Sequence, residues 1–398
     1  MTAEALGQRL EELLLAERSE ANARFFAAEA DRIARLCHRM AERFARGGRL
    51  VALGATPAER SDVRHVAVEF VHPVIVGKRA LPAIGLAREG GPLPRQADLL
   101  VEPGDVTMAF GASAGAIEAV ALARARGSLT IAFEAVGAEW EFEPPSADPF
   151  VRQELVETLY HLLWELVHVF FDHRGLLEGR EARAVHDAGA SSFLYPFLAE
   201  GEHDLNAVLG DVGRSVAMKA EEIGALREQT LTEGRDELAA AARTLRRVFD
   251  SGGKLLALGN GGSATDAMDA VADFRTPPHG WAPRPAIDLT EDPAILTAIA
   301  NDIGIEAIFA RQVIAYGRDG DALLALSTSG NSANVIEALA EARRRGMSTV
   351  AMVGYDGGRV AEQRLADHVI VTRSQHIPRI QEAQAGAYHV LRQLVEAV

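Results

Sequence analysis

Two turns rich in glycine and serine stand out in the sequence: Gly259-Asn260-Gly261-Gly262-Ser263 and Ser327-Thr328-Ser329-Gly330-Asn331-Ser332. Each follows an apolar run of strand character, Lys254–Leu258 and Ala322–Leu326, and each leads into a segment of helical character. A turn of this kind presents free backbone N–H groups and hydroxyls, and the helix dipole adds partial positive charge. Together the two turns predict an α/β unit that binds a phosphorylated small molecule.

The bulk composition limits the classes of function. The chain has 398 residues, enough for two domains, with 48% hydrophobic and 24% charged residues, as is typical of globular proteins. A net charge of −15 argues against nucleic acid as a partner, which needs clustered lysine and arginine. The single cysteine, Cys37, excludes a disulfide framework and is expected to be buried on a helix. We find no secretory signal pattern and no apolar run of the roughly 18 residues that span a bilayer, so we expect a cytoplasmic protein without a membrane partner.

The sequence repeats itself, and the matches come in the same order in both halves. The matched pairs are Arg46–Gly54 with Ser251–Gly259, Gly104-Asp105 with Gly320-Asp321, 116–127 with 335–346, and Gln153, Glu154 and His161 with Gln381, Glu382 and His389.

Short apolar strands alternate with helices in each half, which predicts a parallel sheet covered on both faces. We therefore expect two tandem α/β domains, each a doubly wound parallel sheet flanked by helices. The predicted domains are 1–172 and 204–398, joined by an ordered linker at 173–203. Leading helices are expected at 3–46 and 204–250, and closing helices at 148–172 and 377–397.

The halves differ at the two turns. In the first half, Gly54-Ala-Thr-Pro57 and Met108–Ser113 stand in place of the glycine- and serine-rich turns, and part of the segment that matches Asp292–Arg318 is missing. Phe110 and Ala112 cannot donate side-chain hydrogen bonds. We expect that the first half has lost its phosphate site.

The second half of the sequence resembles a known family. Residues 204–398 are similar to the sugar isomerase (SIS) domain of phosphoheptose isomerases, and the first half resembles the same domain more distantly. The motifs that carry the resemblance are Gly259–Ser263 with Asp266-Ala-Met268, Asn301–Gly304, Ser327–Ile336, and Arg379-Ile-Gln-Glu382 with His389. The resemblance implies conversion of sedoheptulose 7-phosphate to a heptose 7-phosphate, tetramers with sites at subunit interfaces, and often zinc.

Site residues follow from the resemblance position by position. Phosphate and sugar contacts are expected from Asn260, Gly261, Gly262, Ser263, Asp302, Ser327, Thr328, Ser329, Ser332 and Gln381. The family's histidine and its glutamate, a metal ligand and the catalytic base, fall on Asp269 and Asp273 in the second half and on His65 and Glu69 in the first. The family's closing-helix glutamine and histidine fall on Gln381 and His389, and again on Gln153 and His161. Pro378 replaces a further family aspartate.

Isomerisation of a ketose phosphate needs a base that moves a carbon-bound proton and an acid or metal that stabilises the developing oxyanion. The candidate catalytic residues are Glu69, His161, Asp273 and His389. His65 and Glu69 share one helix face and can hold Zn²⁺, so the candidate ligands are His65, Glu69, Gln153 and His161. Gln153 and His161 lie about 12 Å apart along their helix, so ligands are expected from different halves or chains.

Three interpretations stay open. In the first, the second half grips the phosphate and the first half supplies His65 and Glu69, so that a homodimer rebuilds a four-domain assembly. In the second, the chain is a non-catalytic sugar-phosphate sensor or assembly factor, which the altered Asp269 and Asp273 favour. In the third, it is an isomerase with a different sugar substrate.

Overall fold

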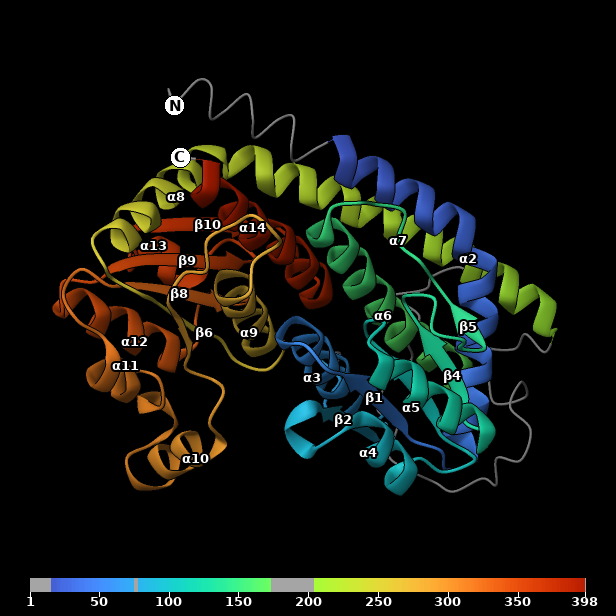
Figure 1. Cartoon of the computed structure of the whole chain (residues 1–398). Helices are drawn as coiled ribbons and strands as arrows, with labels where there is room; N and C mark the ends of the chain where they lie inside the picture. The colour runs from blue at the N-terminus through green and yellow to red at the C-terminus, as the bar shows by residue number, and fades with distance from the viewer. Residues whose placement is uncertain (1–15, 75–77, 173–203, 398) are drawn as a thin grey trace. The chain divides into compact units, whose positions relative to one another are not determined.

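The computed structural model describes residues 16–74, 78–172 and 204–397. The chain forms two five-stranded parallel sheets (Figure 1). The first has the order β2-β1-β3-β4-β5, with strands Leu50–Gly54 (β1), Ala83–Ala87 (β2), Val106–Ala109 (β3), Leu129–Ala132 (β4) and Trp140–Glu141 (β5). The second has the order β10-β9-β8-β6-β7, with strands Leu255–Leu258 (β6), Ala286–Asp288 (β7), Ala322–Ser327 (β8), Ser348–Gly354 (β9) and His368–Thr372 (β10).

The two sheets have the same strand order when their strands are matched along the sequence, so the predicted α/β fold with two repeated parallel sheets is confirmed. Helices of the first half are Ala16–Ala45 (α2), Pro57–Val71 (α3), Leu93–Leu100 (α4), Ala114–Ala125 (α5) and Pro149–Asp172 (α6), with a short 3-10 helix at Arg88–Gly90 (η1). Those of the second are Leu205–Glu233 (α7), Arg235–Asp250 (α8), Gly262–Arg275 (α9), Pro293–Asp302 (α10), Ala310–Tyr316 (α11), Ala333–Arg344 (α12), Gly358–Glu362 (α13) and Ile377–Ala397 (α14), with a 3-10 helix at Ile305–Ala307 (η4).

The helices follow the expected pattern with one difference. The helix expected at 204–250 is divided at Gly234 into α7 and α8, because glycine weakens a helix interior. Residues 3–15 of the first expected helix and the linker at 173–203 lie outside the described residues.

Contacts divide the described chain into two compact units. One comprises residues 16–20, 148–154 and 223–397, and contains the second sheet. The other comprises 21–147, 155–172 and 204–222, apart from 75–77, and contains the first sheet. The first turns of α2 and α6 therefore belong with the second sheet, although they come from the first half of the sequence.

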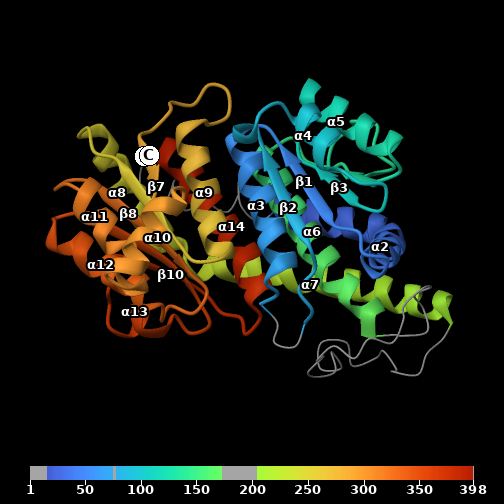
Figure 2. The ribbon, with the colours of Figure 1, turned by 90° about the horizontal axis from the view of Figure 1, so that it is seen from below.

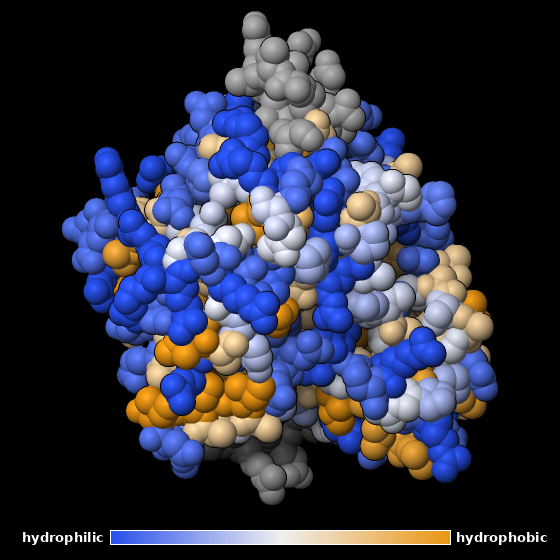
Figure 3. Space-filling model, turned by 60° about the vertical axis from the view of Figure 1, so that its left-hand side comes forward, coloured by the Kyte–Doolittle hydropathy of each residue, from blue (hydrophilic) through white to orange (hydrophobic). Residues whose placement is uncertain are grey.

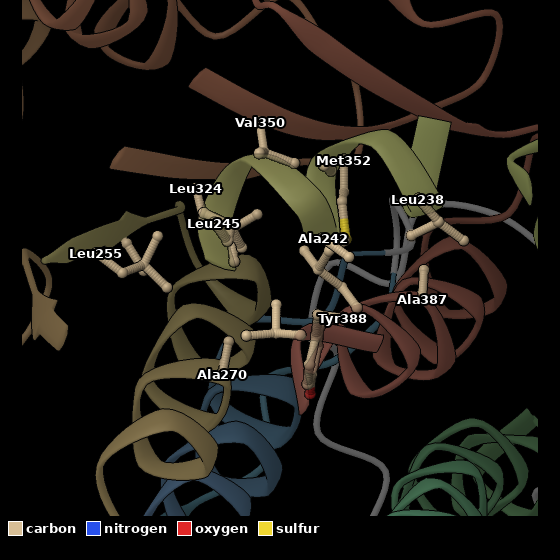
Figure 4. Close-up of a cluster of buried hydrophobic side chains, with 14 of the residues drawn as sticks. Leu238, Ala242, Leu245, Leu255, Ala270, Leu324, Val350, Met352, Ala387 and Tyr388 are labelled. Carbon is tan, nitrogen blue, oxygen red and sulfur yellow. The ribbon is translucent and has the colours of Figure 1, made fainter. Parts of the chain in front are cut away.

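Helices cover both faces of the second sheet. Leu324, Val350 and Met352 pack with α8, α9 and α14, whereas the intervening Leu323 and Ala351 belong to a separate core with α11, α12 and α13. Successive strand residues point to opposite faces, so these are the two faces of one sheet. Figure 4 shows the first of these cores, in which Tyr388 of α14 lies among aliphatic side chains.

The first sheet is built on the same plan. Helices α4 and α5 pack against each other and against β1 and β2 through a core that includes Val51, Leu53 and Leu86 (Figure 2). Cys37 on α2 is fully buried, as expected, and burial raises the pKa of its thiol well above the ordinary value.

Both sheets use an aspartate at the amino end of the central strands. Asp105 accepts hydrogen bonds from the backbone N–H of Arg49 (2.9 Å) and from its guanidinium (2.8 Å). Asp321 accepts from the backbone N–H groups of Lys254 and Arg318, both at 2.9 Å, and pairs with the Lys254 ammonium. Each aspartate thus joins the starts of two adjacent strands.

Hydrophilic residues cover much of the face drawn in Figure 3, and hydrophobic residues gather in separate patches. Exposed large hydrophobic side chains include Ile303, Ile305 and Ile314, around α10 and α11. Among the described helices, none combines the length and the apolar character needed to cross a membrane.

Replacing Leu324 by alanine should lower the free energy of unfolding by about 2–5 kcal/mol, because the side chain is fully buried in the centre of β8. The matched control is Ile303→Ala, which removes a side chain that is 59% exposed and should change stability by less than about 0.5 kcal/mol. Urea unfolding of both variants measures the difference, and equal effects would contradict the assigned core.

Candidate functional site

The two predicted turns follow neighbouring strands of the second sheet. Strand β6 lies between β7 and β8. The chain passes from β6 to β7 on one side of it and then continues to β8 on the other side. At such a topological switch point the loops after the two central strands diverge and form a crevice at the carboxyl edge of the sheet. Gly259–Ser263 follows β6 and Ser327–Ser332 follows β8. The structure therefore brings the two turns to one edge.

A pair of side-chain amides joins the two turns. Asn260 donates from Nδ2 to Oδ1 of Asn334 (2.9 Å), and Asn334 donates from Nδ2 to Oδ1 of Asn260 (2.9 Å). Sequence reasoning did not assign Asn334, although it follows the second turn within the family motif. This pair fixes the spacing of the two turns.

The helix starts at these turns are open to an anion. Among the described residues, the N-cap positions Gly261 of α9 and Ser332 of α12 make no side-chain capping hydrogen bond. A Cβ on Gly259 would lie 2.1 Å from the carbonyl oxygen of Ser263, so only glycine permits this close turn. The N–H groups at these two helix ends, with hydroxyls such as that of the half-buried Ser329, suit a phosphate.

The serine hydroxyls of the second turn also shape it. Ser327 Oγ accepts a hydrogen bond from the Gly330 N–H (3.1 Å), and Ser329 Oγ accepts one from the Asn331 N–H (3.2 Å). Both hydroxyls can still donate a hydrogen bond outward.

The corresponding position in the first sheet is filled by a carboxylate. Oε2 of Glu59 accepts hydrogen bonds from the backbone N–H groups of Ala55 (2.6 Å) and Thr56 (3.1 Å). Thr56 in turn caps α3 through the Glu59 N–H. A Cβ on Gly111, in the turn after β3, would lie 2.0 Å from Glu59 Oε1. A carboxylate at this place repels a phosphate and uses the N–H groups that would bind it.

The predicted acid and base candidates of the second sheet come together. Asp269 and Asp273 lie on α9, and His389 lies on α14. His389 Nε2 is 3.3 Å from Asp269 Oδ2 and 3.5 Å from Asp273 Oδ2. Tyr388 donates its hydroxyl to Asp269 Oδ2 (2.9 Å). The Asp273 side chain is 13% exposed, whereas those of Asp269 and His389 are almost completely buried.

Electrostatics differ among the members of this cluster. Burial alone lowers the pKa of an imidazole, but hydrogen bonds to Asp269 and Glu154 and the charge of Asp273 outweigh it and raise the pKa of His389 to about 10. Burial raises the pKa of the Asp273 carboxyl well above its usual value, and the neighbouring Asp269 raises it further. The cluster therefore contains an imidazolium next to a carboxyl whose affinity for a proton is increased.

Glu154 belongs to the same cluster, although sequence reasoning assigned it no role. Its Oε1 is 3.0 Å from His389 Nδ1, and both its oxygens accept from Arg18 Nε, at 2.9 and 3.0 Å. Burial would raise the pKa of Glu154, but the Arg18 guanidinium and then His389 lower it to about 2. The repeat of Glu154 as Glu382 was the available signal.

Three of the first half's four candidate metal ligands also lie together, in their own unit. His65 and Glu69 of α3 and His161 of α6 are buried, and their donor atoms lie within 4.8 Å of one another. His65 Nε2 is 3.2 Å from His161 Nε2 and 3.9 Å from Glu69 Oε1. Burial lowers the pKa of His65 well below its ordinary value, and His161 lowers it further. Neutral imidazoles are the form that binds a metal.

Other predicted residues lie as follows. Gln381 is buried on α14, and Asp302 is exposed at the end of α10. Gln153 belongs to the unit of the second sheet, whereas His65, Glu69 and His161 belong to the other unit. The roles of Gln381, Asp302 and Gln153 stay predictions.

Comparisons with known proteins agree with the resemblance. The family model described as "SIS domain" matches residues 220–354. A phosphoheptose isomerase of Chlorobium phaeobacteroides is 47% identical over 175 residues, which are 42% of this chain and 76% of that protein.

Several solved structures match almost the whole chain. The C-terminal domain of glucosamine-fructose-6-phosphate aminotransferase from Francisella tularensis has a TM-score of 0.60 at 10% identity, covering 96% of this chain and 93% of that one. Tagatose-6-phosphate ketose/aldose isomerase from Escherichia coli has a TM-score of 0.55 at 12% identity, covering 100% and 94%. At these identities the likeness concerns the fold, which the two proteins share with both halves of this chain.

The raised pKa of His389 predicts that stability falls at alkaline pH. The imidazolium stabilises the folded protein fully below its ordinary pKa of 6.5, and this contribution is lost as the pH rises through about 10. Urea unfolding between pH 6.5 and 10, with a chelator present, should therefore show falling stability in the wild type and a flatter profile in His389→Asn. Parallel profiles would show that the imidazolium contributes nothing.

Proposed function

The chain belongs to the phosphoheptose isomerase family of SIS-domain proteins, and we propose that this sugar-phosphate isomerase acts on sedoheptulose 7-phosphate or a closely related ketose phosphate. The phosphate is assigned to the turns after β6 and β8. Relatives named as isomerases favour an enzyme over a sensor or assembly factor.

The observation that supports the proposal is that α9 carries residues of both the predicted phosphate turn and the acid–base cluster. Its first residues form the phosphate turn, and Asp269 lies seven residues beyond Gly262, about 10 Å along the helix axis. Asp273 lies one turn further. A substrate held by its phosphate at one end must therefore place its reacting carbons several bonds away, which favours a long open-chain sugar over a triose.

We assign a different catalytic role to each residue of the cluster. Asp273, the most exposed member of the cluster and one with increased proton affinity, is assigned the transfer of a proton between adjacent sugar carbons. The His389 imidazolium is assigned the stabilisation of the developing enediolate oxygen. Asp269, which accepts hydrogen bonds from Tyr388 and His389, fixes the cluster's geometry.

We assign zinc to the first half's cluster rather than to Asp269, Asp273 and His389, whose donor atoms also lie within 4.8 Å of one another but whose imidazole is held as a cation. Two imidazole nitrogens and one carboxylate oxygen form a common catalytic zinc set, which leaves one position open. His65, Glu69 and His161 would hold the ion, which supplies Lewis-acid polarisation of an oxygen when it is bound. We retain the predicted homodimer and cytoplasmic location as parts of this proposal.

Ser329→Ala should raise the KM for the sugar phosphate roughly 10- to 150-fold with kcat little changed, because a hydrogen bond to a charged group contributes about 1.5–3 kcal/mol. The phosphate itself does not react, so the loss falls on binding. Ser348→Ala, at the opposite edge of the sheet where β9 starts, is the control and should leave both constants unchanged. An unchanged KM in Ser329→Ala would remove this turn from the phosphate site.

Two variants separate the two candidate clusters. Asp273→Asn should lower kcat by roughly 10²-fold or more, because a positioned acid or base contributes about that factor, while binding of inorganic phosphate is kept. Glu69→Gln should lower the zinc content and affect kcat less. If Glu69→Gln instead abolishes turnover while Asp273→Asn is active, the chemistry belongs to His65, Glu69 and His161. Assays with added Zn²⁺ and with chelator accompany both variants.

A further inference from the structure

The imidazole of His389 is enclosed by residues that come from the first half of the sequence. The unit that contains the second sheet also includes residues 16–20 of α2 and 148–154 at the start of α6. The Phe150 ring lies 5.0 Å from the His389 ring, centroid to centroid, and 5.8 Å from the Trp281 ring. These aromatic rings limit the access of water to the imidazole.

We propose that Glu154 is a positioning residue for His389 and that Arg18 holds Glu154 in place, an inference that rests on the proposed function. Glu154 Oε1 lies 3.0 Å from His389 Nδ1. A hydrogen bond at this nitrogen fixes the plane of the ring and leaves Nε2 directed at Asp269 and Asp273. Glu154 therefore determines which nitrogen of His389 meets the substrate.

Arg18 holds the carboxylate of Glu154 in place. Its Nε contacts both carboxylate oxygens, and its Nη2 donates to Gln393 Oε1 (3.3 Å). Gln393 lies one turn beyond His389 on α14 and donates to Asp148 Oδ2 (2.9 Å). Arg18 thus connects the starts of α2 and α6 to the helix that carries the imidazole.

A second arginine holds the backbone at the same place. Arg227 donates from Nη2 to the Glu154 carbonyl (3.0 Å) and from Nε to the Glu382 carbonyl (3.2 Å). The position of Glu154 is therefore fixed at both its side chain and its backbone. It follows that residues 204–398 by themselves lack the group that orients their own histidine.

The test compares Glu154→Gln with wild type in the full chain. We expect kcat for sedoheptulose 7-phosphate to fall roughly 10–100-fold, by analogy with the range found when the hydrogen-bond partner of a metal-bound histidine is lost. The KM should stay within about twofold, because the variant leaves the phosphate turns unchanged. Arg18→Lys keeps the positive charge but loses the several N–H donors of the guanidinium. We therefore expect kcat to fall less than in Glu154→Gln and KM again to stay constant.

Asp321→Asn is the matched control. It also replaces a buried, paired carboxylate by an amide in the same unit, but it lies where β8 starts, at the edge opposite the phosphate turns. It should lower stability in urea unfolding without changing kcat. If Glu154→Gln loses stability to a similar degree but keeps the wild-type kcat, the positioning role is overturned and Glu154 is a structural residue only.

A nitrogen-15 NMR spectrum of the imidazoles gives a readout that does not depend on turnover. The wild type should show a slowly exchanging Nδ1–H of His389, assigned with His389→Asn, and Glu154→Gln should lose it or shift it. Absence of this signal from the wild type overturns the inference. If the wild type shows the signal but no isomerase activity, the proposed function fails while the positioning contact stands. If Glu154→Gln does not fold, the spectrum and kinetics of Arg18→Lys decide.

Discussion

Charge pairing in the interior is the constraint on which the unit of the second sheet depends. The side chains of His389, Glu154 and Arg18 are each at most 2% exposed, and an isolated charge at such a depth is strongly unfavourable. The charges alternate in sign along the contacts, from Arg18 to Glu154, to His389 and to Asp269. Each ion is therefore compensated only when α2, α6, α14 and α9 all contribute. The first turns of α2 and α6 belong with the second sheet for this reason.

A second constraint comes from the parallel sheet. All carboxyl ends of its strands meet at one edge, so the loops at the switch point become the natural place for an anion. The two halves differ in whether the helix starts at this edge are capped by the protein's own side chains. Around the first sheet, Thr56 and Ser113 cap the helices α3 and α5, and Glu59 brings its own carboxylate to the turn. Around the second sheet, Gly261 and Ser332 leave the helix starts open to solvent or ligand.

The secondary structure could be predicted from the sequence more completely than the contacts within the candidate site. The strands and helices could be predicted because each is recorded in a local pattern, and the repeat allowed each half to support the other. The capping box of Thr56 and Glu59 has a sequence signal, a threonine followed three residues later by glutamate, but the sequence analysis did not assign it. The contact of Arg18 with Glu154 was not visible, because 136 residues separate the two positions. Likewise, Asn260 and Asn334 are 74 residues apart, and only the adjacency of β6 and β8 brings them together.

The two polar clusters show how one framework can support two kinds of chemistry. The aligned positions hold His65, Glu69 and His161 in one half and Asp269, Asp273 and His389 in the other. In the first half, burial and a second imidazole lower the pKa of His65, which favours the neutral imidazole. In the second half, hydrogen bonds to Asp269 and Glu154 raise the pKa of His389 to about 10 despite burial, which yields a cation. The helices set only the distances between these side chains, and their immediate partners set the charge. A few substitutions around a retained histidine can therefore change it from the neutral imidazole that a metal prefers to the imidazolium that suits an oxyanion, as the roles proposed for the two clusters require.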